Sequence, residues 1–196
     1  MDSGKFNSKV LIYLFEWGFD VRATVLILIV MASFAYAEES CELKDIGLNQ
    51  GSPLIEKYYY LGTCQYRNEE YAKAAQNWTE IAELTEVEQG FVELQVNAFN
   101  NLGYLVFFGY GVDKNQEEAI EYWTKAVALG HEEAEYHLCH AYGDEKQSTY
   151  NPTKAIPHCE KARFLYQGDQ SIDQTNDFIL NQIKGYLSKL KAVNYK

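Results

Sequence analysis

Proline and low-complexity sequence are almost missing from this chain of 196 residues. It has only three prolines and no low-complexity run, while 47% of its residues are apolar. Segments that stay unfolded in water are poor in apolar residues, so this composition excludes a disordered tail or linker. The chain is long enough to bury one or two hydrophobic cores.

Catalytic motifs are missing as well. The sequence contains no nucleophile elbow, no phosphate-binding loop and no zinc-protease motif. Acidic pairs such as Glu117-Glu118 and Glu132-Glu133 stand where helices are expected to begin, and the helix dipole accounts for them there. We therefore expect no enzyme activity and no cofactor.

No apolar run is long enough for a permanent membrane helix. The run from about Ala23 to Phe34 spans about a dozen residues, whereas a spanning helix needs roughly 20. It is followed by Ala35-Tyr36-Ala37, the small-x-small pattern that a signal peptidase reads.

We therefore expect residues 1–37 to be a signal peptide, and the mature chain to begin at Glu38 in the periplasm or outside the cell. A membrane anchor at the same place is the alternative. The stretch before the apolar run is long and partly acidic, which a true start codon near Val21 would explain.

Basic residues are the minority among the charged ones. The chain has 17 Lys and Arg against 28 Asp and Glu, which gives a net charge of -11 at pH 7. Residues 1–37 carry three basic and three acidic side chains, so the other 159 residues keep the full negative charge. Such a surface repels nucleic acid and anionic lipid. We expect a protein or peptide partner, and no stable membrane insertion after signal cleavage.

The expected mature chain has four cysteines, namely Cys41, Cys64, Cys139 and Cys159. An exported protein folds in an oxidising space, where an even number of cysteines favours disulfide bonds. Four cysteines allow three pairings, and their number alone does not choose among them.

Helical periodicity with an internal repeat fills the rest of the chain. Residues 97–130 and 133–166 align at an offset of 36, and the spacing predicts helices over 92–108, 115–129 and 132–142, with another from Asn151 onward. An earlier unit with a shorter loop lies in 53–84. Two helices per period of this length predict an all-α fold, an α-solenoid of about three antiparallel helix pairs. Residues 167–196 contain a further amphipathic helix that would cap the stack.

The middle unit resembles a known repeat. It shows the pattern Ala98-x-x-x-Leu102-Gly103-x-x-Val106-x-x-Gly109-x-Gly111, followed by Ala119-x-x-x-Trp123-x-x-Ala126-x-x-x-Gly130. This pattern resembles the Sel-one-like repeat, a relative of the tetratricopeptide repeat. The next unit departs from it, because Glu145 and Gln147 replace the two loop glycines and Pro157 lies inside its second helix. The resemblance covers residues 53–166, and residues 38–52 form an N-terminal segment before it.

The resemblance implies a pairing of the cysteines. In such hairpins a glycine of the first helix leaves room for a large aromatic of the second, so Gly103 and Trp123 should face each other. The 36-residue offset places Cys139 and Cys159 at these two positions in the next unit. We therefore expect these two cysteines to form one disulfide, and the remaining two to link the N-terminal segment to the first repeat.

A metal site is the alternative for the same hairpin. His137, Cys139, His140, His158 and Cys159 are all possible ligands. His137 and His140 share a helix face, but Cys139 points elsewhere. In an exported protein with a ready disulfide partner we expect the disulfide and no metal.

By analogy with tetratricopeptide repeats, the first helix of each pair lines the concave face of the solenoid. With Leu61, Leu102 and Leu138 as registers, nine side chains should point inward. They are Tyr59, Thr63, Tyr66, Asn97, Asn100, Tyr104, Phe108, Tyr136 and His140. Aromatic and amide groups suit a peptide, because they offer flat apolar area and hydrogen bonds to its backbone. The alternative is that some of these tyrosines only pack between repeats.

The sequence therefore predicts an exported, disulfide-linked repeat protein that acts as a non-enzymatic scaffold or adaptor. The resemblance implies a part in the assembly or regulation of a cell-envelope complex. The alternative, from the same resemblance, is a cysteine-rich repeat protein that binds penicillin or hydrolyses β-lactams. The cysteines of those proteins occupy other repeat positions.

Overall fold

The computed structural model describes residues 40–168 and 174–194. The signal peptide expected at 1–37 lies outside the described residues. Within them the chain forms seven α-helices, one short 3-10 helix and no strand, which confirms the all-α expectation. None of the helices in this part of the chain is long and apolar enough to cross a bilayer.

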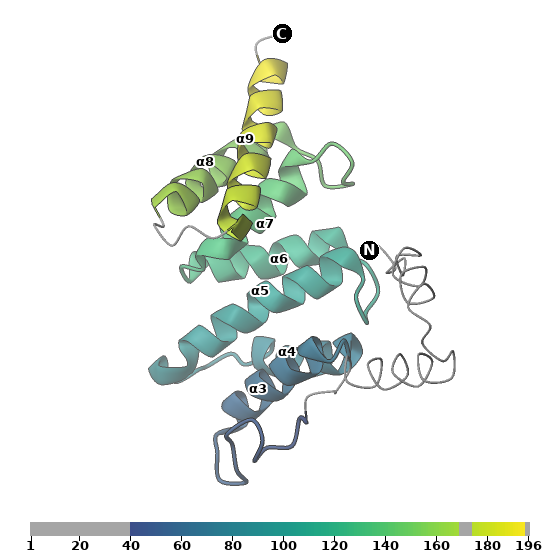
Figure 1. The fold of residues 1–196 in the computed structure, drawn as a ribbon, viewed down its shortest axis with the longest axis vertical. Helices are drawn as coiled ribbons and strands as arrows, with labels where there is room; N and C mark the ends of the chain where they lie inside the picture. The colour runs from purple at the N-terminus through teal and green to yellow at the C-terminus, as the bar shows by residue number, and fades with distance from the viewer. Residues whose placement is uncertain (1–39, 169–173, 195–196) are drawn as a thin grey trace, which may run out of the picture. The chain divides into compact units, whose positions relative to one another are not determined.

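The helices form antiparallel pairs that follow one another in chain order (Figure 1). The pairs are α3 (Leu54–Arg67) with α4 (Tyr71–Ala82), α5 (Val92–Phe108) with α6 (Gln116–Ala128), and α7 (Glu132–Gly143) with α8 (Pro152–Gly168). A 3-10 turn at Gln89–Phe91 leads into α5. The last helix, α9 (Gln174–Asn194), packs against both α7 and α8. This is the α-solenoid that the repeat predicts.

Local signals set the helix boundaries. The Asn115 side chain accepts a hydrogen bond from the Glu118 backbone N–H at 3.2 Å and so caps α6. Asn151 caps α8 in the same way through the Lys154 N–H at 3.1 Å, and Pro152 is the first helical residue. Helix α5 ends at Gly109, which has a φ of 76° that few other residues adopt.

Each helix pair shares its core with the first helix of the next pair. Trp78 of α4 is buried in one cluster with Leu102 of α5. Trp123 of α6 is buried in the next cluster with Leu138 of α7. The third cluster joins α7 and α8 to α9. Since no pair buries its apolar face alone, the pairs must stack, which is the physical basis of a solenoid.

A glycine and a tryptophan meet inside each of the first two pairs. A Cβ added to Gly62 would lie 2.6 Å from Trp78 Nε1, and one added to Gly103 would overlap the Trp123 ring. Each indole N–H donates to the backbone carbonyl three residues before the glycine, at 3.3 Å for Tyr59 and 3.1 Å for Asn100. The expected contact between Gly103 and Trp123 is therefore confirmed.

A disulfide takes this position in the third pair. Cys139 and Cys159 are bonded, fully buried, and separated by 4.6 Å between Cα atoms. They belong to the same core cluster as Ile183 and Leu187 of α9. Pro157 lies two residues before Cys159 without ending α8, which continues to Gly168.

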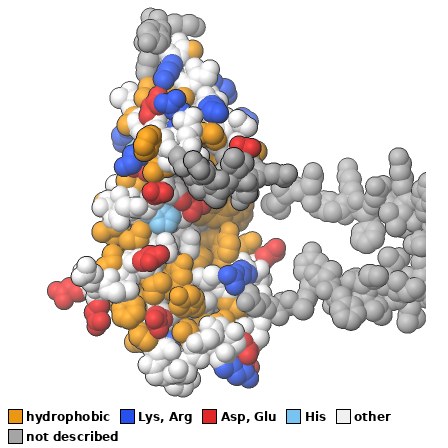
Figure 2. Space-filling view, turned by 60° about the vertical axis from the view of Figure 1, so that its left-hand side comes forward, with side chains coloured by type: hydrophobic (Ala, Val, Ile, Leu, Met, Phe, Trp, Pro, Cys, Tyr) orange, Lys and Arg blue, Asp and Glu red, His pale blue; other side chains and the backbone are white. Residues whose placement is uncertain are grey.

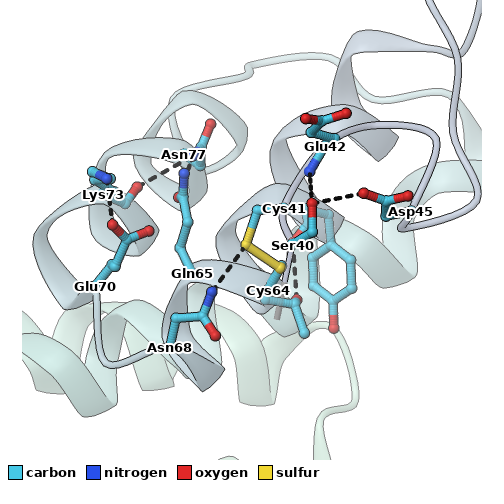
Figure 3. The surroundings of a disulfide bond; sticks show 12 residues. Ser40, Cys41, Glu42, Asp45, Cys64, Gln65, Asn68, Glu70, Lys73 and Asn77 are labelled. Carbon is cyan, nitrogen blue, oxygen red and sulfur yellow. Dashed lines mark hydrogen bonds and ion pairs between the residues drawn. A yellow bond between two sulfur atoms is a disulfide. The ribbon is translucent and has the colours of Figure 1, made fainter. Parts of the chain in front are cut away.

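The second disulfide joins Cys41 to Cys64 of α3 (Figure 3). The preceding segment is held by short-range hydrogen bonds, such as Leu48 N–H to the Leu43 carbonyl at 2.7 Å. The Asn68 amide, just after α3, donates to Cys41 Sγ at 3.4 Å. The segment is thus fixed to the first helix pair, as the cysteine pairing predicts.

The loops between paired helices differ in how they contact the preceding pair. Gly111, with a φ of 69°, lies so close to the start of α4 that an added Cβ would be 2.6 Å from the Tyr71 carbonyl carbon. In the next loop, the Gln147 side chain accepts from Gln116 Nε2 at 2.6 Å, and the Ser148 N–H donates to Gln116 Oε1 at 3.1 Å. Hydrogen bonds to the start of α6 therefore replace a close glycine contact.

Candidate functional site

The first helices of the three pairs line a pocket of about 420 Å³. Helices α3, α5 and α7 supply most of its wall, and α4 contributes the Trp78 side chain. Nine residues line it, namely Tyr59, Thr63, Tyr66, Trp78, Asn100, Asn101, Tyr104, Glu133 and His137. Figure 2 shows one face of the molecule, on which apolar and tyrosine side chains gather at the level of α3 to α5 with acidic side chains among them. A pocket of this volume suits a side chain and the backbone that carries it.

Five of the nine residues predicted for the concave face line this pocket. They are Tyr59, Thr63, Tyr66, Asn100 and Tyr104. They come from one face of α3 and one face of α5, which the 3.6-residue period places side by side. The sequence register therefore predicts the parts of the pocket wall that α3 and α5 form.

The other four predicted residues are engaged elsewhere. Asn97 Oδ1 lies 3.1 Å from Nε2 of His131, which caps α7. Phe108 is exposed near the end of α5 and stacks on Tyr110. Neither residue lines the pocket.

Helix α9 accounts for the last two. The Tyr136 hydroxyl donates to Gln182 Oε1 at 2.5 Å, and His140 Nδ1 lies 2.7 Å from the Tyr186 hydroxyl. Tyr136 and His140, which were predicted for the concave face, thus contact α9 and do not line the pocket. Helix α9 does not only close the end of the stack but also packs on α7, which the repeat spacing cannot show.

Four pocket residues were missed by the sequence register, and one of them is Trp78 of α4. Asn101 lies beside Asn100, while Glu133 and His137 lie one helical turn apart on α7. The dipole explanation of Glu133 is incomplete, because this carboxylate also faces the pocket. Extending the register of α7 by one turn toward its start would have included it.

Asn100 is the most constrained polar group in the pocket. Its side chain is only 4% exposed, and its Nδ2 donates to Glu133 Oε2 at 3.1 Å. Its Oδ1 is buried without a hydrogen-bond partner. A buried acceptor left unpaired costs about 1–3 kcal/mol, so a donor from a bound molecule would be stabilised here.

His137 adds a neutral wall to the pocket. Its ring stacks on Trp123 with centroids 4.9 Å apart and lies 6.0 Å from the Tyr104 ring. Burial, together with a smaller effect of the nearby histidines, lowers the pKa of His137 to about 3, so the ring carries no charge at neutral pH. Glu133 Oε1 lies 3.7 Å from His137 Nε2, but the neutral ring does not balance the charge of this carboxylate.

Aromatic rings continue from the pocket toward the ends of the helices. Tyr66 lies 5.8 Å from Trp78, and Tyr104 lies 4.9 Å from Phe108 and 5.8 Å from Tyr110, measured between ring centroids. Burial raises the pKa of Tyr104 to about 12, so its hydroxyl keeps its proton. The site thus offers flat apolar area, neutral hydroxyls and amides, and one carboxylate.

The groups that line this pocket are of the kind that bind a peptide segment. No group of three or more His, Cys, Asp or Glu side chains in the described ranges is placed to hold a metal ion. His137 stays neutral, as its pKa requires, and it lies against an indole instead of a nucleophile. Amides beside aromatic rings are typical of a surface that binds a peptide segment.

Comparison with known proteins bears on two of the three helix pairs. The family model described as Sel1 repeat matches the chain twice, at residues 98–131 and 132–167. These ranges hold most of α5 with α6, and α7 with nearly all of α8. No curated protein and no solved structure matches the chain significantly.

Proposed function

Because this chain is a Sel1-repeat protein, and Sel1 repeats generally mediate contacts between proteins, we propose that it is a non-enzymatic scaffold. Its groove, formed by the pocket residues of α3, α5 and α7, binds a segment of a partner protein. The family recognition made from the sequence pattern is confirmed by the two matched repeats.

One observation carries the proposal. Asn100 is buried in the pocket with an unpaired acceptor, although buried amide oxygens are nearly always hydrogen-bonded. A backbone N–H or a side-chain donor of a bound segment would supply the missing bond. The tyrosines around it would bury apolar parts of the same segment.

The place of action that we propose is the periplasm or the outside of the cell. Both cysteine pairs are disulfides, and such bonds persist in oxidising compartments. In that setting the protein would assemble or regulate a complex of the cell envelope, with the groove selecting the partner.

Site-specific photocrosslinking tests the groove. A benzoylphenylalanine placed at Asn101, which lines the pocket and is partly exposed, should capture a defined partner in cells of the source organism. The matched control carries the same group at Gln76, an exposed residue of α4 that does not line the pocket. Mass spectrometry of the adducts identifies the captured protein and the crosslinked peptide.

The expected result is one partner captured from Asn101 and not from Gln76. Capture of the same proteins from both positions would indicate non-specific contact and would contradict a binding groove. A partner captured only from Gln76 would place the interaction on the second helices of the pairs instead.

A further inference from the structure

The groove has a negative charge that no lysine or arginine in the described part of the chain pairs with. Glu133 is the single charged residue among the nine that line the pocket, and its side chain is 52% exposed. None of the ion pairs between described residues joins Glu133 to a lysine or an arginine, and the neighbouring His137 is neutral. The pocket therefore presents an uncompensated negative charge.

The unpaired side-chain oxygen of Asn100 is a second polar feature of the pocket that can bind a hydrogen-bond donor. The Glu133 carboxylate accepts from Asn100 Nδ2, which leaves Oδ1 as the unpaired end of the amide. This oxygen can only accept hydrogen bonds, and because it is buried, a donor reaches it when the Asn100 side chain shifts toward the pocket. An ammonium or guanidinium group can donate to the amide oxygen and to the carboxylate together, because each has several N–H donors.

The tyrosine rings of the pocket are a third feature that favours a bound cation. The protein places its own cations over aromatic faces elsewhere, with Lys125 Nζ 5.5 Å from the Phe99 centroid and Lys154 Nζ 5.3 Å from that of Tyr142. The pocket has the rings of Tyr66 and Tyr104 but no lysine or arginine of its own. A cation near a tyrosine face is stabilised by the ring quadrupole.

We propose that the partner segment is basic, and that a lysine or arginine side chain enters the groove between Tyr66 and Tyr104 to pair with Glu133 and Asn100. This inference rests on the proposed function and adds the chemical class of the partner. The net charge of -11 acts in the same sense, since it draws basic segments toward the protein. An acidic segment would meet the Glu133 carboxylate and would offer Asn100 Oδ1 no donor from its side chains.

A random peptide library displayed on phage and selected on the purified, oxidised protein tests the proposal. The selected peptides should share a lysine or arginine at one position. Replacing that residue by norleucine, which keeps the alkyl chain without the charge, should weaken binding by about tenfold, measured by fluorescence anisotropy with the synthetic peptides.

Two variants of matched charge assign the effect to Glu133. Glu133→Gln keeps an acceptor but removes the charge, and it should reduce the preference for lysine over norleucine to about threefold or less. Glu132→Gln makes the same change at the adjacent, exposed position of the first turn of α7, outside the pocket lining. It should leave the preference unchanged.

The outcomes separate this inference from the proposed function. Asn101→Trp should fill the groove, with circular dichroism used to check that the variant is folded. Peptides that lose binding in this variant but lack a basic residue would overturn the inference and leave the groove as a binding site. A library that yields no peptide sensitive to Asn101→Trp would overturn both. An equal effect of the two glutamate variants would show only a long-range charge effect and would also overturn the inference.

Discussion

At the scale of single residues, one contact recurs in three chemical forms along the solenoid. Gly62 receives Trp78, Gly103 receives Trp123, and Cys139 is bonded to Cys159 at the equivalent place. The glycine and the tryptophan depend on each other, because any side chain at the glycine would occupy the space of the indole. Two cysteines replace this glycine–tryptophan contact. Each side chain is small, and the disulfide between them joins the two helices directly.

Gly103→Ala tests the close contact of the indole. The new Cβ would overlap Trp123, which is fully buried and cannot move without displacing its neighbours. We expect the free energy of unfolding to fall by about 2 kcal/mol, although alanine favours a helix over glycine by about 1 kcal/mol. Urea denaturation followed by circular dichroism measures the change.

The control is Gly185→Ala in α9. An added Cβ there has no atom within 4 Å, so only the helix propensity should act and the protein should become slightly more stable. If both variants were stabilised alike, Trp123 would have room to move and the contact would not set the helix spacing.

At the scale of elements, the loops between paired helices use two different means to hold the preceding pair. The loop after α5 lays Gly111 directly on the backbone at Tyr71. The loop after α7 has no glycine there, and Gln147 and Ser148 bond to Gln116 instead. Loss of the loop glycines thus has a compensation in hydrogen bonds, besides the nearby disulfide.

Gln116→Ala should destabilise the protein by about 1–2 kcal/mol, because Gln116 is buried and makes three hydrogen bonds to the loop. The midpoint of urea unfolding measures this loss, and faster amide exchange at Ser148 should accompany it. Gln76→Ala, at an exposed position of α4, is the control and should change stability by less than about 0.5 kcal/mol. Equal effects at the two positions would mean that the loop bonds add nothing.

At the scale of the whole molecule, the two disulfides stabilise different parts of the structure. Cys139 and Cys159 lie within the core that α7, α8 and α9 share. Cys41 instead ties down a segment of mostly exposed residues that forms no α-helix. The first bond should therefore act on global stability and the second mainly on local order.

Alanine at both Cys139 and Cys159 should lower the free energy of unfolding by about 3 kcal/mol or more, from the 20-residue loop and the cavity left behind. Alanine at both Cys41 and Cys64 should cost about 1 kcal/mol in urea unfolding, because the freed segment gains entropy in the folded state as well. Its amide exchange, for example at Leu48, should rise. Equal global losses from the two double variants would contradict this division.

The sequence by itself determined the helices and the contacts inside each pair. Caps at Asn115 and Asn151 and the terminating Gly109 are local signals, so the boundaries of α5, α6 and α7 and the start of α8 could be predicted within about two residues. The cysteine pairing followed as well, because a repeat makes equivalent positions comparable. Five of the pocket residues could be predicted for the same reason.

Only the tertiary structure decided how much of the concave face is open. Helix α9 crosses α7 and forms hydrogen bonds with Tyr136 and His140. Because α9 is not part of a repeat, no equivalent helix earlier in the chain predicts where it packs. The pairing of Glu133 with Asn100 likewise joins residues of two different helix pairs. Such contacts depend on the angle at which one pair packs on the next, and a periodic pattern within a pair does not contain that angle.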